Sequence, residues 1–173
     1  MLTVFYSTTI SDMITQADQK RDAVFSHLQD IFNSLCRPAL TKRLAWEDGA
    51  QYADSCGAST YVRKTTNASP LISDCAAIRD YYAQHNGRYV ASYADRAFKG
   101  GSYCRLVITN TCVFGIKSDS FYLVNVGSRD ISDLTRDSIN KFRGTQRVGA
   151  EGHMTCHDDY SHPTSVDWAL FTN

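Results

Sequence analysis

The chain has no excess of charge of either sign, because eighteen lysines and arginines balance eighteen aspartates and glutamates among its 173 residues. Proteins that hold nucleic acid usually carry a basic surface, so we expect no nucleic-acid partner. A run of about eighteen apolar residues is also missing, and we therefore expect no membrane-spanning helix. The length suits one domain with an extension, and we expect a monomer.

Several motifs of known chemistry are absent as well. The sequence has no Gly-x-Ser-x-Gly nucleophile turn, no phosphate-binding loop and no Cys-x-x-Cys pair. The six cysteines are scattered and lack the paired spacing of a zinc ribbon. Their even number favours a disulfide framework in an oxidising compartment, so we expect an extracellular protein. They are Cys36, Cys56, Cys75, Cys104, Cys112 and Cys156.

The beginning of the sequence lacks the pattern of a secretory signal peptide. It has no basic start, and the polar run Ser7-Thr8-Thr9, followed by Asp12, interrupts any apolar core. Three interpretations remain open: the natural start lies upstream, the chain is exported by another route, or it stays inside the cell.

Residues 1–45 are interpreted as an N-terminal extension. Apolar residues between positions 12 and 35 recur with helical periodicity, Ser11 can cap the helix, and Pro38 ends it. The segment is either an accessory helix or a propeptide, since Lys42-Arg43 offers a dibasic processing site.

Residues 46–157 read as an α+β domain with a mainly antiparallel sheet and two helices on one face. The first helix lies near residues 73–85, where Ser73 or Asp74 can cap it and Asn86-Gly87 supplies a left-handed stop. Strands follow in "RYVASY", "YCRLVIT", "CVFGIK" and "SFYLVNVG", with a tight turn at Asn110. A second helix occupies "SRDISDLTRDSINKF", and "VGAEGHMTC" is a final strand.

The segment "GHMTCHDDYSHP" gathers the candidate metal ligands His153, His157, Asp158 and His162. The glycines around it favour a strand, on which His153 and His157 lie too far apart for one ion. We therefore prefer solvated histidines and expect no metal and no cofactor.

A catalytic role for a cysteine finds little support. Cys156 and His157 are adjacent on a strand and point apart, and Cys104–His85 is the other conceivable pair. The acidic residues Asp130, Asp133 and Asp137 follow helical spacing and read as a cap and a solvated face. No motif with a mechanism remains, so we expect a protein that is not an enzyme.

One modification motif is present. Asn67-Ala68-Ser69 forms a glycosylation sequon, and Pro70 directly after it is expected to weaken acceptance.

Five blocks in order resemble the fungal extracellular-protein-2 effector family, also described as the putative necrosis-inducing factor domain. They are "CGASTY", "TTNASPLISDC", "CVFGI", "VGSRDISDLTRDSINKF" and "VGAEGHMTC", which together run from Cys56 to Cys156. Two positions depart from the family pattern. Tyr89 stands where the family has tryptophan, and Asn110 stands where it has glycine, which Asn can replace in a turn.

The resemblance implies a secreted, cysteine-stabilised virulence protein that binds a host or competitor protein or membrane component. Chitin or cell wall is the alternative partner, because related modules occur fused to chitinase-like hydrolases. The order of segments is also similar to the split β-α-β sandwich of a smut-virus killer toxin, which implies a membrane or ion-channel target.

In this family the framework cysteines correspond to Cys56, Cys75, Cys112 and Cys156, and no catalytic residue is carried over. Cys36 and Cys104 are additional. They either form a third disulfide that holds the N-terminal helix to the domain, or Cys36 is a buried thiol. The loop Arg96–Ser102 is a candidate binding surface. Residues 158–173 follow the matched region and are expected to form a C-terminal tail.

Overall fold

The computed structural model describes residues 44–92, 103–143 and 146–173. The helix expected over residues 12–35, the site Lys42-Arg43, Cys36 and the loop 96–102 lie outside the described residues. In chain order the elements are β1 (Ala45–Asp48), the short helix η1 (Ala50–Tyr52), β2 (Cys56–Ser59), β3 (Val62–Arg63), α2 (Ile72–Gln84), β4 (Gly87–Ala91), β5 (Cys104–Thr109), β6 (Cys112–Lys117), β7 (Val124–Gly127), α3 (Ser128–Phe142), β8 (Ala150–His157) and β9 (Pro163–Thr172).

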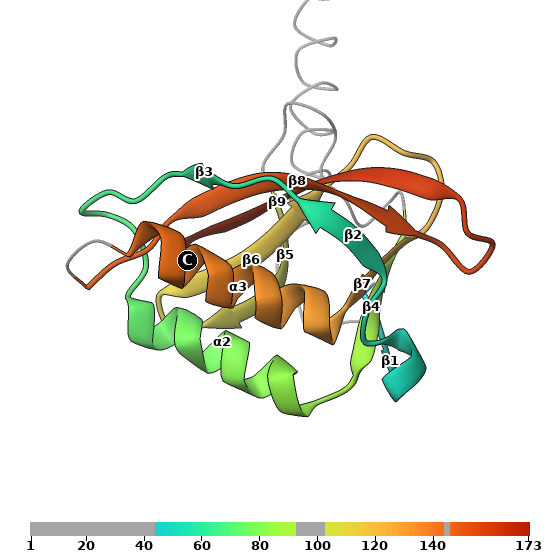
Figure 1. Cartoon of the computed structure of the whole chain (residues 1–173), viewed down its shortest axis with the longest axis horizontal. Coiled ribbons are helices and arrows are strands. Elements are labelled where there is room, and N and C mark those ends of the chain that lie inside the picture. Colours follow the sequence, from blue (N-terminus) through green and yellow to red (C-terminus); the bar gives the residue numbers. More distant parts are fainter. Residues whose placement is uncertain (1–43, 93–102, 144–145) are drawn as a thin grey trace, which may run out of the picture. The chain divides into compact units, whose positions relative to one another are not determined.

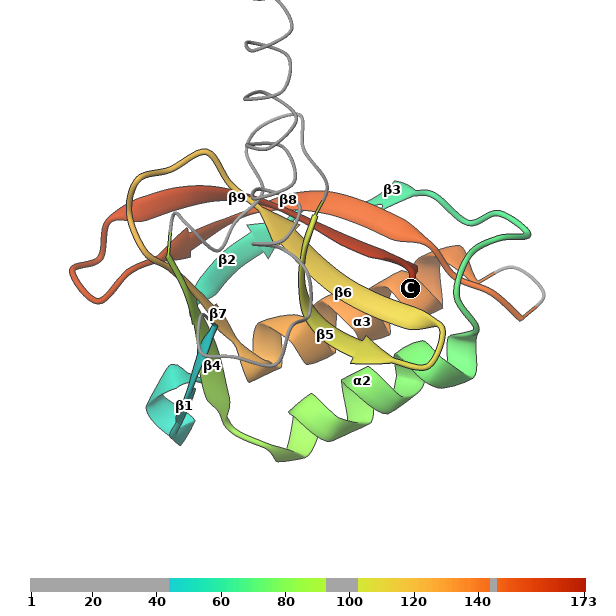
Figure 2. The same cartoon turned by 180° about the vertical axis from the view of Figure 1, so that it is seen from behind.

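Within the described residues the strands form two sheets, and every strand pair is antiparallel. The larger sheet has the order β2-β8-β9-β6-β5, with β3 also paired to β8, and the smaller has the order β1-β4-β7. Helices α2 and α3 lie side by side against one face of the larger sheet, as both views show (Figure 1, Figure 2). The predicted α+β class is therefore confirmed.

The two helices form because their apolar residues recur every three or four positions. In α2 the buried side chains are Cys75, Ile78 and Tyr82. In α3 Ile131 and Leu134 are buried on the face that meets the sheet, while the charged residues lie opposite. This periodicity is a local property, which is why both helices could be predicted.

The ends of α2 differ from the prediction. Leu71 occupies the N-cap position, without a side-chain hydrogen bond, and Asp74 instead accepts hydrogen bonds from the backbone and hydroxyl of Thr111. At the other end, Gly87 belongs to β4 and its backbone does not adopt the left-handed conformation. A side chain there would collide with Trp46 and the Glu47 carbonyl, so Gly87 is required by close packing.

The hairpin between β5 and β6 agrees with the sequence. Thr109 pairs with Cys112, and Asn110 adopts a φ of 44° between them. Asn tolerates this left-handed conformation better than most residues, so the turn predicted at Asn110 is confirmed.

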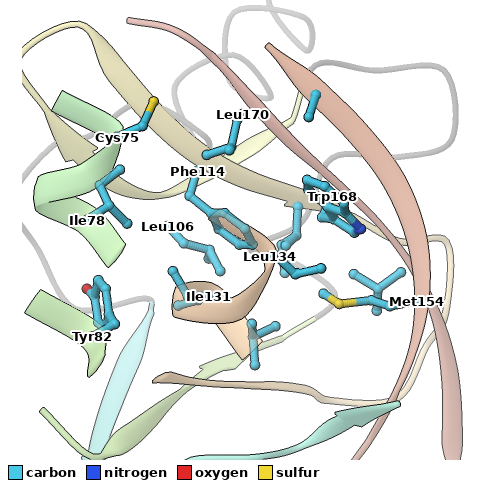
Figure 3. Packing of buried hydrophobic residues seen from close by; sticks show 14 of the residues in the cluster. Cys75, Ile78, Tyr82, Leu106, Phe114, Ile131, Leu134, Met154, Trp168 and Leu170 are labelled. Carbon is cyan, nitrogen blue, oxygen red and sulfur yellow. The ribbon is translucent and has the colours of Figure 1, made fainter. Parts of the chain in front are cut away.

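The core lies between the helices and the larger sheet. Phe114 of β6 and Trp168 of β9 stack with ring centroids 6.3 Å apart and are fully buried. Ile131 and Leu134 of α3 lie around Phe114, and Ile78 of α2 closes the same space (Figure 3). Aromatic rings of this size supply much of the buried apolar area of a domain.

Two expectations about the second half of the chain are wrong. Residues 163–172 do not belong to a tail: they form β9, which pairs with β8 on one side and β6 on the other. The strand predicted in "SFYLVNVG" begins only at Val124, and Phe121 to Leu123 are exposed in the preceding loop. Pairing between distant segments sets both results: β9 has two partner strands, whereas β7 pairs with β4 only from Val124 onward.

Candidate functional site

Two disulfides join the four framework cysteines. Cys56 of β2 is bonded to Cys156 of β8, its direct partner in the antiparallel pair. Cys75 of α2 is bonded to Cys112 of β6, which ties the helix to the sheet. Cys104 is buried at the start of β5, and its expected partner Cys36 lies outside the described residues. That third bond remains a prediction.

The candidate metal ligands do not come together. Among the described residues, no group of three acidic, histidine or cysteine side chains could hold a metal ion. His153 contacts Asp167 of β9 at 3.1 Å, and His157 is exposed at the end of β8. His162 contacts Asp158 in the β8–β9 loop, and this contact stabilises a turn.

The proposed cysteine–histidine pairs are likewise separate. Cys156 is in a disulfide beside His157. His85 stacks on Tyr81 at the end of α2, with ring centroids 3.9 Å apart. Asn67 of the sequon is exposed in a turn, whereas Ser69 is buried and accepts a hydrogen bond from the Thr66 backbone. Glycosylation remains a prediction.

The three carboxylates of α3 have different surroundings. Asp130 Oδ2 accepts hydrogen bonds from the backbone nitrogens of Gly127, Ser55 and Cys56. Burial raises the pKa of Asp130 to about 7, and the neighbouring Asp54 adds to the rise although the backbone bonds oppose it. Asp130 is thus the cap that the sequence predicted, and it also anchors the start of β2.

Asp133 and Asp137 belong to the outer face of the same helix. Both form ion pairs with Arg136, at 2.6 and 3.0 Å. Asp137 also accepts a hydrogen bond from the hydroxyl of Tyr61. Burial and this contact raise the pKa of Tyr61 to about 12. Asp133 and Asp137 therefore form the solvated face that their spacing predicts.

A different part of the domain gathers exposed aromatic rings. The β6–β7 loop (residues 118–123) and the β8–β9 loop (residues 158–162) lie at the same end of the domain, as both views show (Figure 1, Figure 2). Tyr122 stacks on His162 with ring centroids 4.6 Å apart, and Tyr160 follows at 6.1 Å from His162. We call these three residues the tip surface. Tyr122 is 52% and Tyr160 80% exposed.

Asp158 orders the part of the tip surface that comes from the β8–β9 loop. Its carboxylate accepts hydrogen bonds from the backbone nitrogens of Tyr160 and His162 and contacts His162 Nδ1 at 2.8 Å. Burial acts to raise the pKa of Asp158, but these bonds outweigh it and lower that pKa below its usual value. Ser161 completes the turn with a φ of 63°. One buried carboxylate thus fixes the loop backbone at Tyr160 and His162 and the imidazole of His162.

The neighbouring Asp159 anchors the same loop to the smaller sheet. Its Oδ1 lies 2.6 Å from Nη1 of Arg88 in β4, and the buried Asn125 donates to the same oxygen. Arg88 is 7% exposed, pairs with Glu47 as well, and lies 4.0 Å above the ring of Tyr52. Such a buried guanidinium, with both partners in place, holds its surroundings rigidly.

Sequence reasoning missed this site. The sequence predicts a strand at Tyr122 and a tail at Tyr160 and His162, offers His162 only as a candidate metal ligand, and does not single out Arg88. The available signal was the presence of aromatic residues within the polar runs "KSDSFY" and "HDDYSHP", where no core is expected. Chemically, the arrangement offers ring faces and hydroxyl groups on a rigid support, which suits binding.

Comparisons with known proteins agree with the matched blocks. The sequence model of a family described as "Pathogen effector; putative necrosis-inducing factor" matches residues 55–156. Two relatives come from Penicillium expansum: "Probable chitinase LysM18" is 28% identical over 152 residues, and "Secreted chitinase LysM12" is 26% identical over 133 residues. The alignments cover 78% and 72% of this chain, but only 10% and 8% of the relatives.

The chain therefore spans about a tenth of the length of these curated relatives. Within the described residues, no helix is long and apolar enough to cross a membrane.

Proposed function

The chain belongs to the pathogen-effector family of necrosis-inducing factors, and from this premise we propose that it is an extracellular effector that acts by binding a component of a host or a competing organism. The tip surface carries this proposal, because it presents aromatic rings to solvent on a support fixed by Asp158 and Arg88. Exposed aromatic residues of this kind are enriched where proteins bind partners.

The chemistry of the ionisable side chains supports binding over catalysis. Asp130 accepts hydrogen bonds from three backbone N–H groups, and Asp158 accepts one from the backbone of its own loop. Arg88 forms ion pairs with two carboxylates. These contacts give the three groups structural roles in holding the fold together.

Two disulfides support an extracellular location. Disulfides persist in oxidising compartments, and each typically adds ~2–4 kcal/mol to the free energy of unfolding. A domain braced by both keeps its binding surface intact outside the cell.

A second candidate function is a wall-associated accessory module. The observation that favours it is the similarity to two proteins whose names contain chitinase. In this case the domain would hold a protein at a polysaccharide instead of provoking a response in a host.

The test uses the purified, oxidised full chain. We expect infiltration into leaves of responsive plants to cause cell death, or addition to competing fungi to inhibit growth, and we expect reduction and alkylation of the protein to abolish the effect. Growth inhibition relieved by added calcium would favour a toxin acting on membranes or channels. Release of sugars from chitin by the pure protein would contradict the binding proposal, as would the absence of both biological effects.

A further inference from the structure

The tip surface has the composition of a sugar-binding platform, and we propose that it binds β-1,4-linked N-acetylglucosamine oligosaccharides. This inference deepens the proposed function, since it names a ligand for the same surface. Its three rings come from two loops: Tyr122 and His162 stack and cover one face of each other, and Tyr160 lies tilted beside His162.

The parts of the two tyrosine rings that the stack leaves exposed favour a ligand with a flat apolar face. The face of an aromatic ring carries a negative quadrupole, which attracts the weakly positive C–H groups on the apolar face of a pyranose ring. Tyr122 and Tyr160 also carry hydroxyl groups at their edges, which suit the hydroxyl-rich rim of a sugar. Both side chains are more than half exposed, so a ligand can reach them.

The charges around the tip surface favour an uncharged ligand. Asp158 is paired with His162, and Asp159 is paired with Arg88, which is itself shielded from solvent. Neither carboxylate of this loop depends on a cationic ligand, because hydrogen-bond donors of the domain already engage both. A neutral polysaccharide, which offers hydroxyl and amide groups in place of charge, suits such a surface.

One polar group beside the rings can bind a sugar, and the relatives indicate N-acetylglucosamine as that sugar. Asp159 uses Oδ1 for Arg88 and Asn125, and its side chain is 51% exposed. The second carboxylate oxygen can therefore accept a hydrogen bond from a sugar, for example from the N–H of an acetamido group. The chitinase relatives point to the same polymer.

The rigidity of the β8–β9 loop also favours binding of a ligand. Binding costs less when the contacting side chains are already ordered, and here one carboxylate, Asp158, orders the loop that carries Tyr160 and His162. A loop that served only to connect β8 with β9 would not need a buried acid that orders the backbone carrying two exposed rings.

The chain contains a matched control for these residues. Tyr81 of α2 is 53% exposed and stacks on His85, so it repeats the tyrosine–histidine pair of Tyr122 and His162 outside the two loops. Replacement of Tyr81 removes the same number of atoms from a similar environment.

The experiment measures binding of chitohexaose by titration calorimetry and retention on insoluble chitin, with cellulose for comparison, for the full chain. We expect the wild type to bind chitohexaose and to prefer chitin to cellulose. We expect Y122A and Y160A each to weaken binding about tenfold or more, and Y81A to leave it unchanged. Circular dichroism verifies that each variant is folded, and the 80% exposed Tyr160 can be removed without loss of core packing.

Three outcomes overturn the inference: no binding of chitohexaose, equal binding by the wild type and both loop variants, or binding to phosphatidylcholine vesicles in place of the sugar. The effector function is tested separately by infiltration and growth assays. If the wild type causes cell death without binding the sugar, only this inference fails. If it binds the sugar through the tip surface and has no biological effect, only the effector proposal fails.

Discussion

The carboxylate of Asp130 lies 2.9 Å from the backbone nitrogen of Ser55, which precedes it by 75 residues. The same oxygen accepts the N–H groups of Cys56 and of Gly127 at the start of α3. A single side chain therefore joins the beginning of β2, next to the Cys56–Cys156 disulfide, to the N-terminus of a helix. Because this half-buried carboxylate bonds to distant backbone segments, its protonation affects the stability of the domain.

The first prediction concerns pH. Since the pKa of Asp130 is raised to about 7 in the folded state, its contribution is fully present below the unfolded value of about 4 and is lost as pH rises through 7. Between these values each pH unit should lower the free energy of unfolding by at most about 1.4 kcal/mol. Urea denaturation from pH 4 to 8 measures this dependence. In D130N the dependence should flatten, because an amide does not ionise; an unchanged profile would refute the assignment.

The second prediction concerns the two disulfides. Cys56–Cys156 closes a segment of 100 residues and Cys75–Cys112 one of 37, so the longer loop restricts the unfolded chain more. Each paired replacement by alanine should cost several kcal/mol, with C56A/C156A the more costly by about 1 kcal/mol on the chain-entropy relation. Guanidinium titrations of both double variants give the comparison. If loss of Cys75–Cys112 cost more than loss of Cys56–Cys156, effects in the folded state would outweigh the entropy of the unfolded chain.

The third prediction concerns close packing at Gly152. A side chain at this position would collide with the Thr60 carbonyl and the indole of Trp168, whereas at Gly57 the nearest atom, the Thr155 carbonyl oxygen, is 3.7 Å away. We expect G152A to destabilise the domain by about 1–3 kcal/mol and G57A to have a small effect. Thermal unfolding of the two variants is the measurement, and similar melting temperatures would contradict it.

The fourth prediction concerns the last strand. Removal of residues 163–173 deletes β9, which carries the buried Trp168 and separates β8 from β6 in the sheet. The truncated chain should lose its cooperative unfolding transition and become sensitive to protease. Removal of the exposed Asn173 alone should leave a folded domain, which serves as the control. A folded, protease-resistant truncation would mean that the segment is indeed a tail.

Local features of the sequence determined a large part of this protein. The spacing of apolar residues was enough to predict α2 and α3, and the left-handed tolerance of Asn110 was enough to predict the hairpin turn. The blocks around the framework cysteines were enough to identify the family. Each of these depends on residues a few positions apart, where geometry follows from periodicity and backbone preference.

Only the tertiary structure decided the rest. It paired Cys56 with Cys156, made a central strand of residues 163–172, and turned Asp130 into a link between distant segments. It also brought Tyr122 beside His162 and left both rings in solvent. These relationships join segments that are far apart in the chain, and the register of antiparallel strands sets which residues meet, so no short window of sequence contains them.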